Sequence, residues 1–323
     1  MKSHAIIILL FLSAVSGCIG NISGNVVREE NAYENGITIE AYFCPRDGCE
    51  DIMVNNINNA KNSAHCAFFD IDSKELINVI AKKSHSAEVK IVIDKGNYKN
   101  QIKGNVKLAD SKQYMHNKFC IIDNNAVFTG STNPTNNDLN INNNNLIIIK
   151  SKYIAENYEY EFNELWNGVY TAGDKVKYDK VSSENLVIGN YFCPEDSCRE
   201  KVIKTINEAK HNIYFMAFSF TDGGIADAIL FKNLEIRGIF ETLQAGSQYS
   251  QFQRMKDFGI DVKKDKNKKN MHHKVFIIDN ETVITGSYNP TESGNLRNDE
   301  NLVIIRSRGI AKGFVEEFEL LWQ

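Results

Sequence analysis

The pattern of apolar and polar positions alternates between strand and helix periods, and it runs through the chain twice. Each half begins with an apolar strand-like run, at residues 37–43 and 186–192, and continues into apolar residues at helical spacing, at 50–62 and 199–210. A strand, a short helix and a second strand follow, at 63–71, 74–83 and 89–94 and again at 212–220, 224–230 and 235–241. This order predicts an α/β fold built from two similar layered halves.

The two halves share a stretch that contains most of the candidate chemistry. Residues 115–135 and 271–291 agree without a gap at 14 of 21 positions, at an offset of 156 residues. Each half then ends in a helix with one apolar side, formed by Ile154, Tyr158, Phe162 and Trp166 and by Ile310, Phe314, Phe318 and Trp322. We therefore expect one half at 37–167, a linker at 168–184 and the other half at 185–323.

Within the shared stretch, a histidine and a lysine stand two residues apart at the start of a predicted strand. Residues i and i+2 of a strand share a face, so His116 and Lys118 are expected to project together, with Asp123 at the strand's end. Ser131 and Asn133 follow a glycine, which lets the backbone approach a ligand, and they supply uncharged donors for an anion. The second copy repeats the set as His272, Lys274, Asp279, Ser287 and Asn289, and the histidines, lysines and aspartates of both copies are the candidate catalytic residues.

A histidine beside a strand is more often structural than catalytic. A duplicated motif could also be kept only because its hairpin defines the fold. However, the polar set is identical in the two copies while neighbouring apolar positions differ, as in Phe119 against Val275 and Phe128 against Ile284. This contrast favours one shared active site over a purely structural repeat.

The motif H-x-K-x4-D followed by G-S-x-N resembles the signature of the phospholipase D superfamily, and the chain has it twice. The resemblance covers residues 37–322, and the compact halves look most like the small phospholipase D-type endonucleases, here with two halves fused. It implies two α-β-α layered halves that pack about a pseudo-two-fold axis with both motifs at their seam. A monomer would then hold one complete site.

The resemblance also implies a mechanism. One histidine attacks phosphorus and forms a phosphohistidine, and the other protonates the leaving oxygen and then activates water. In the superfamily the nucleophile is usually the histidine of the first motif, which favours His116 here. Phosphate oxygens would be held by the lysines and by Ser131, Asn133, Ser287 and Asn289. This chemistry requires no metal and no other cofactor.

One position departs from the family's pattern. A carboxylate 28 residues after the motif histidine hydrogen-bonds a catalytic imidazole in the family, and Glu300 occupies that position in the second half. The matching residue of the first half is Asn144, and an amide can orient an imidazole but cannot stabilise its cation in the same way. We expect two histidines of unequal basicity, and the sequence leaves open which of them Glu300 serves.

The N-terminus has the pattern of an export signal. Lys2 precedes an apolar run too short for a comfortable membrane span, and Val15-Ser16-Gly17 leads into Cys18, which resembles a bacterial lipobox. We expect a signal peptide at 1–18, lipid attachment at Cys18 and a polar tether at 19–36. The protein would then be an extracytoplasmic, membrane-anchored lipoprotein, or a secreted protein if the signal is cut without lipidation.

Export changes the interpretation of the cysteines. Cys44 and Cys49 form a C-x4-C pair that recurs as Cys193 and Cys198, and outside the cytoplasm each pair is a candidate local disulfide. A zinc site made by all four is the alternative. Cys66 and Cys120 lie in apolar runs and are expected to be buried, inert thiols.

Composition limits the substrate class only in part. The chain is 42% hydrophobic and 24% charged, which are globular values, and its formal net charge of −4 excludes a surface that attracts polyanions everywhere. Lysines nevertheless gather before both motifs, most densely at 263–269. A nuclease acting on nucleic acid is the first hypothesis. A phospholipase D acting on membrane headgroups and a non-catalytic phosphate-binding protein are the alternatives.

Overall fold

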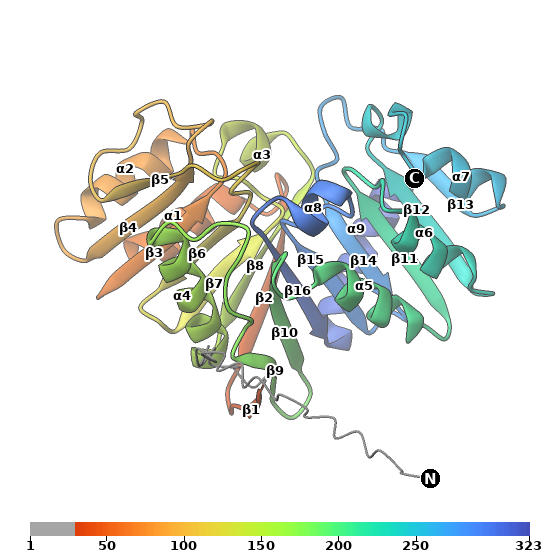
Figure 1. Ribbon diagram of the computed structural model, residues 1–323, viewed down its shortest axis with the longest axis horizontal. Helices are drawn as coiled ribbons and strands as arrows, with labels where there is room; N and C mark the ends of the chain where they lie inside the picture. Colours follow the sequence, from red (N-terminus) through yellow and green to blue (C-terminus); the bar gives the residue numbers. More distant parts are fainter. Residues whose placement is uncertain (1–29) are drawn as a thin grey trace, which may run out of the picture.

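The computed structural model describes residues 30–323. The signal peptide expected at 1–18, the lipid attachment expected at Cys18 and the first part of the tether lie outside the described residues. Two mixed sheets lie side by side, one in each half of the chain (Figure 1). Among residues 30–323, no helix has the length and apolarity that crossing a bilayer requires.

The first sheet has the strand order β2-β8-β7-β6-β3-β4-β5. Its strands are β2 (Thr38–Cys44), β3 (Ser63–Phe68), β4 (Glu88–Asp94), β5 (Val106–Ala109), β6 (Lys118–Ile122), β7 (Ala126–Gly130) and β8 (Asn144–Lys150). The second sheet has the order β1-β9-β10-β16-β15-β14-β11-β12-β13. Its strands are β1 (Glu30–Tyr33), β9 (Tyr178–Ser182), β10 (Val187–Cys193), β11 (Asn212–Ala217), β12 (Glu235–Phe240), β13 (Asp261–Lys264), β14 (Lys274–Ile278), β15 (Thr282–Gly286) and β16 (Glu300–Arg306). From β10 onward, the second sheet repeats the topology of the first.

The helices of the first half are α1 (Cys49–Asn58), α2 (Lys74–Lys83), α3 (Asn136–Asn140) and α4 (Lys152–Trp166). Those of the second are α5 (Cys198–Asn207), α6 (Gly223–Leu230), α7 (Phe252–Asp257), α8 (Glu292–Leu296) and α9 (Arg308–Trp322), with a 3-10 turn at Gln244–Gly246. The turn and α7 have no counterpart in the first half, and they lie in the interval where the second half has seven extra residues.

Each sheet lies between helices because its strands are apolar on both faces. Along β6, Phe119 and Ile121 pack into the cluster that contains α4, while Cys120 and Ile122 pack with residues of α1 and α2. The predicted α-β-α layering is therefore confirmed. Helices α4 and α9 also cross between the halves, since α4 contacts β9 and β10 and α9 contacts β2. These two helices hold the halves together.

Two segments that were expected to be irregular form strands. Residues 30–33 of the expected tether form β1, and residues 178–182 of the expected linker form β9, which pairs with β1 in parallel. Strand β9 in turn pairs antiparallel with β10, so both extend the second sheet. The pairing partners lie about 150 residues apart in the chain, which local sequence patterns do not reveal.

All six cysteines among the described residues form disulfides. Cys44–Cys49 and Cys193–Cys198 each close their own loop, which answers the choice between local disulfides and a joint zinc site in favour of the former. The expectation for Cys66 and Cys120 was wrong, because these two residues are bonded to each other. They are direct cross-strand partners on β3 and β6, and this register brings the two side chains together.

Candidate active site at the seam between the halves

The two motif histidines stand where the halves meet, each held by backbone contacts to the other half. The backbone N–H of His116 donates to the carbonyl of Asp299 at 2.9 Å, and that of His272 donates to the carbonyl of Asn143 at 2.8 Å. The residues just before them also form isolated bridges across the seam. Asp299 and Asn143 immediately precede β16 and β8. The two halves are therefore joined by backbone hydrogen bonds at equivalent positions, just before these strands begin.

Each imidazole is held by a side chain from the opposite half. Nδ1 of His116 lies 2.7 Å from Oε2 of Glu300, and Nδ1 of His272 lies 2.9 Å from Oδ1 of Asn144. The question left open by the sequence is thereby answered, because Glu300 serves the histidine of the other motif. Both contacts use Nδ1 and leave Nε2 of each ring for substrate.

The motif lysines are buried beside the histidines. Nζ of Lys118 donates to the carbonyl of His116 at 2.8 Å, and Nζ of Lys274 donates to the carbonyl of His272 at 2.8 Å. Only 2% of Lys118 and 3% of Lys274 is exposed, so each ammonium group has little water around it. Such charges favour an anion in the space before them.

Burial sets the protonation of the site. It lowers the pKa of His116 to about 4, with Lys118 and Lys274 acting in the same direction and Glu300 opposing them. It also lowers the pKa of Lys118 to about 8. The pKa values of His272 and Lys274 are lowered too, chiefly by burial and then by neighbouring cations. Without a bound anion, both imidazoles are therefore neutral at pH 7, which is the form that a nucleophilic histidine requires.

Two phenylalanines that sequence reasoning missed complete the walls of the site. Phe69 lies edge-on to His116 with ring centroids 4.7 Å apart, and Phe218 lies in the same way against His272 at 4.6 Å. Nζ of Lys118 and Nζ of Lys274 lie 5.1 and 5.0 Å from the same rings. A signal was present, since the two phenylalanines follow equivalent apolar strands at matched positions of the repeat.

The two motif serines, which are expected to bind phosphate, contact the residues that hold the imidazoles. Ser131 and Ser287 are fully buried. The Oγ of Ser131 donates to Oδ1 of Asn144 at 2.9 Å, and the Oγ of Ser287 donates to Oε2 of Glu300 at 2.6 Å. Their hydroxyls are thus committed to the groups behind the histidines. These contacts can position Asn144 and Glu300, and the expected role of the serines in binding phosphate stays a prediction.

The two motif asparagines are not equivalent. Asn133 donates both its backbone N–H and its Nδ2 to Oδ2 of Asp138, at 3.0 and 2.6 Å. The position equivalent to Asp138 in the second half is Gly294, so Asn289 has no such carboxylate to bind. The Oδ1 atoms of both asparagines have no hydrogen-bond partner among the described residues. The Nδ2 donor of Asn133 is therefore engaged by Asp138, whereas no equivalent carboxylate engages Asn289.

The structure does not bring the motif aspartates to the histidines. Asp123 accepts backbone N–H bonds from Lys61, Asn62 and Ser63, at distances of 2.6 to 3.1 Å. Asp279 does the same for the backbone of residues 210–212. Each aspartate follows a five-residue strand that starts at the motif lysine, so about 15 Å of chain separates it from the chemistry. Their contacts fix the start of the neighbouring strand, which is a structural role.

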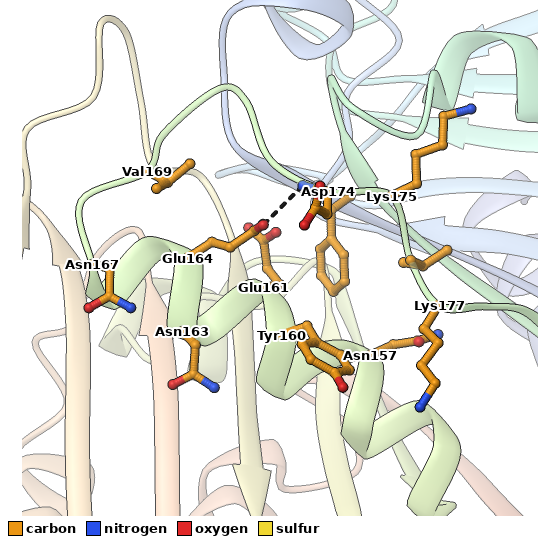
Figure 2. A pocket seen from close by; sticks show the side chains of 12 residues that line it. Asn157, Tyr160, Glu161, Asn163, Glu164, Asn167, Val169, Asp174, Lys175 and Lys177 are labelled. Carbon is orange, nitrogen blue, oxygen red and sulfur yellow. Dashed lines mark hydrogen bonds between the residues drawn. The ribbon is translucent and has the colours of Figure 1, made fainter. Parts of the chain in front are cut away.

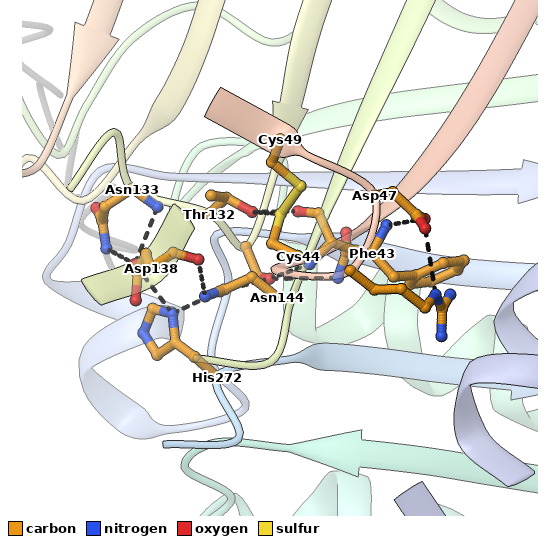
Figure 3. The surroundings of a disulfide bond; sticks show 12 residues. Phe43, Cys44, Asp47, Cys49, Thr132, Asn133, Asp138, Asn144 and His272 are labelled. Carbon is orange, nitrogen blue, oxygen red and sulfur yellow. Dashed lines mark hydrogen bonds and ion pairs between the residues drawn. A yellow bond between two sulfur atoms is a disulfide. The ribbon is translucent and has the colours of Figure 1, made fainter. Parts of the chain in front are cut away.

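The local disulfides lie next to the imidazole-holding residues. Cys44 pairs with Asn144 across β2 and β8, and Cys193 pairs with Glu300 across β10 and β16. Cys44 Sγ also lies 3.3 Å from Oγ1 of Thr132 (Figure 3). Each disulfide therefore braces the strand end that presents Asn144 or Glu300 to a histidine.

A separate cavity of about 330 Å³, whose lining includes none of the motif residues, lies along α4 (Figure 2). Glu161 and Glu164 line it, and with Glu195 they are the one group of side chains in residues 30–323 whose spacing would suit a metal ion. Burial, and then neighbouring carboxylates, raise the pKa of Glu195 to about 8 and that of Glu161 well above its usual range. One link between this cavity and the site is Asn117, whose Nδ2 donates to Oε1 of Glu161 at 3.3 Å.

Comparison with known proteins gives the same family in both halves. Residues 53–166 and 202–322 match the family described as cardiolipin synthase, PLD-like domain. A phospholipase D from Rickettsia felis is 28% identical over 152 residues, which are 46% of this chain and 76% of the relative. A mitochondrial cardiolipin hydrolase from Xenopus tropicalis is 30% identical over 137 residues, which are 41% of this chain and 65% of the relative.

A solved structure is similar over most of the chain. The crystal structure of a phosphatidylserine synthase from Haemophilus influenzae aligns with a TM-score of 0.64, covering 88% of this chain and 85% of that one. At 11% identity this likeness concerns the fold alone. The matched family stretches cover most of both halves and include both histidine–lysine pairs. The chain therefore belongs to the phospholipase D superfamily, with a PLD-like domain in each half, and it is a phosphoric diester hydrolase.

Proposed function

We propose that this phosphodiesterase is a nuclease that works without a metal ion, through a phosphohistidine, outside the cytoplasm. Nε2 of His116 attacks phosphorus and forms a P–N bond, while the P–O bond to the leaving group breaks. The leaving oxygen takes a proton from His272. Water then attacks phosphorus and gives a proton to His272, and the P–N bond breaks to release the phosphate product.

The charges around the site support this sequence of steps. A neutral His116 is ready to attack, because burial keeps its pKa at about 4. His272 must carry a proton in the first step, although neighbouring Lys274 and Lys118 lower its pKa in the free site. A bound phosphodiester brings a negative charge that offsets those lysines and raises the pKa of His272. Substrate binding thus favours the protonated form of His272, which the reaction needs as its general acid.

The observation that carries the choice of nucleic acid is a lysine-rich loop that crosses the seam. This loop, residues 265–271, leads from β13 to His272, and Lys268 and Lys269 in it are exposed. Asn267 donates to Oδ1 of Asn143, and the backbone N–H of Asn270 donates to Oδ1 of Asn142, both in the first half. The two lysines therefore lie beside the site, where they can bind phosphates that flank the one being cleaved.

A phospholipase D is the second candidate. Curated relatives bear the names phospholipase D and mitochondrial cardiolipin hydrolase, and an anchored enzyme would meet headgroups easily. A non-catalytic phosphate-binding protein is the third, and the complete pairs His116–Lys118 and His272–Lys274 count against it.

Location outside the cytoplasm, by way of a lipid on Cys18, is part of the proposal. It rests on the lipobox-like sequence before Cys18 and is supported by the disulfides of Cys44–Cys49, Cys66–Cys120 and Cys193–Cys198. Such bonds persist in oxidising compartments.

The test is a side-by-side assay of the full chain in detergent, with EDTA present, on single- and double-stranded DNA, RNA, phosphatidylcholine and cardiolipin. We expect cleavage of a nucleic acid, with a KM that rises steeply with salt. Changing Lys268 and Lys269 to glutamate should raise that KM about 10-fold or more at low salt and leave kcat nearly unchanged. The matched control changes Lys82 and Lys312, exposed lysines on α2 and α9, to glutamate. Headgroup release without nucleic-acid cleavage would establish the second candidate instead.

A further inference from the structure

The two halves carry their carboxylates at different positions around the histidines. Glu300 and Gly294 stand in the second half where Asn144 and Asp138 stand in the first. The first half thus lacks a carboxylate at the usual position but has one six residues earlier, in α3. The second half has the reverse arrangement.

Asp138 reaches the histidine that lacks a direct carboxylate. Its Oδ2 lies 3.5 Å from Nδ1 of His272, and only 4% of the residue is exposed. Asn144 meets the same Nδ1 atom, at 2.9 Å, from a second direction. Figure 3 shows both side chains converging on His272. The ring therefore has an amide oxygen as hydrogen-bond acceptor and a buried negative charge close by.

An equivalent amide holds the carboxylate in both halves. Nδ2 of Asn298 donates to Oε1 of Glu300 at 3.0 Å. Its counterpart Asn142 donates from Nδ2 to Oδ1 of Asp138 at 2.6 Å. The supporting donor is thus conserved within the repeat although the carboxylate comes from a different position in the sequence.

The second half cannot hold a carboxylate side chain at position 294, which is equivalent to Asp138. A Cβ atom added to Gly294 would lie 2.3 Å from the backbone carbonyl oxygen of Asn289, which is too close for any side chain. In the first half, Asp138 begins its side chain without such a restriction and closes a network with Asn133 and Asn142. Each half therefore has one position for the carboxylate.

We infer that Asp138 is a positioning residue that replaces the missing carboxylate of the first half and holds His272 for acid–base work. The inference rests on the proposed phosphohistidine reaction for its kinetic consequence, but the contact itself does not depend on the substrate. The carboxylate stabilises the imidazolium from 3.5 Å, less directly than Glu300 stabilises His116 from 2.7 Å. A less stabilised imidazolium gives up its proton more readily, which suits the residue that protonates the leaving group.

The charged groups around His272 define the expected effect of pH. Asp138 raises the pKa of His272, whereas Lys274, Lys118 and His116 lower it. Removing the carboxylate therefore lowers the pKa of His272 further. Since the general acid must be protonated, the basic limb of the kcat profile should move to lower pH.

The test compares D138N with D138N/N144E, which returns the carboxylate to the position of Glu300. We expect D138N to lower kcat about 10- to 100-fold with a small change in KM, and D138N/N144E to recover much of it. The control is D72N, because Asp72 is an exposed carboxylate that accepts the backbone N–H of Asn136 at the start of the same helix and does not touch His272. Nuclear magnetic resonance titration of the free proteins should show a lower pKa of His272 in D138N, but not in D138N/N144E or in D72N.

The titration separates this inference from the proposed function, because it needs no substrate. A lower pKa of His272 in D138N supports the role of Asp138 even if nucleic acid is not cleaved. If the pKa of His272 is unchanged in D138N and activity falls only in proportion to the amount of folded protein, the inference is overturned. Asp138 would then serve only the network with Asn133. If D138N does not fold, D138G/N144E copies the second half and should fold with a titrating, active His272. Failure of that variant as well would contradict the inference.

Discussion

Oε2 of Glu300 lies 2.7 Å from Nδ1 of His116, although the two residues belong to different halves of the chain. The reciprocal contact joins Asn144 of the first half to His272 of the second. Neither half therefore contains a complete site. The fusion of two PLD-like domains places both contacts in one chain and lets their chemistry diverge.

Replacing Glu300 by glutamine should lower kcat about 10- to 100-fold, because the imidazole loses the charge that orients and stabilises it. Glu300 raises the pKa of His116, so its loss lets the ring give up its proton at a lower pH. The acidic limb of the kcat/KM profile should move to lower pH. Glu292→Gln, which alters an exposed carboxylate on α8, is the matched control. An acidic limb that stays in place would mean that another group titrates there.

Replacing Asp123 by alanine should destabilise the fold by about 1–3 kcal/mol, since the three backbone N–H groups that it binds lose a charged acceptor. The kcat of the folded fraction should stay within about twofold, because Asp123 is far from the imidazoles. The pKa of this carboxyl is lowered by the same N–H bonds, so its contribution to stability is lost as pH falls through that pKa. Denaturant unfolding and kcat together provide the measurement. A large loss of kcat without loss of stability would show that Asp123 has a catalytic role after all.

Replacing Glu195 by arginine should stabilise the protein near pH 8. The equivalent position in the first half is Arg46, whose Nη1 lies 2.7 Å from Oε2 of buried Glu317, whereas Glu195 faces Glu161, the counterpart of Glu317. Because the folded-state pKa of Glu195 is raised to about 8, its protonated form stabilises the fold at low pH and that contribution is lost as pH rises. The gain in Tm for E195R should therefore grow from pH 5 to pH 8. A gain that is equal at both values would show that the carboxyl pair is not the cause.

The repeat made much of this architecture predictable. The order of strands and helices follows from apolar periodicity, and the pairs His116–Lys118 and His272–Lys274 follow from i, i+2 spacing on strands. Long-range contacts were not predictable, because they depend on how the sheets meet. Asp138 and His272 lie in different halves, and no local pattern distinguishes that aspartate from a helix-start residue. The contacts of Ser131 and Ser287 with Asn144 and Glu300 were likewise not predictable, because the sequence does not show which way a hydroxyl faces.

The central claim is that one shared site contains two histidines with different roles. Bis(4-nitrophenyl) phosphate tests it most directly, because its leaving group departs without a proton and its use does not depend on the natural substrate. His272→Ala should release about one equivalent of nitrophenolate per chain and then stop, with the phosphoryl group on His116 by peptide mass spectrometry. His116→Ala should give no burst and no adduct. A burst from His116→Ala with the adduct on His272, or steady turnover by either variant, would contradict the account.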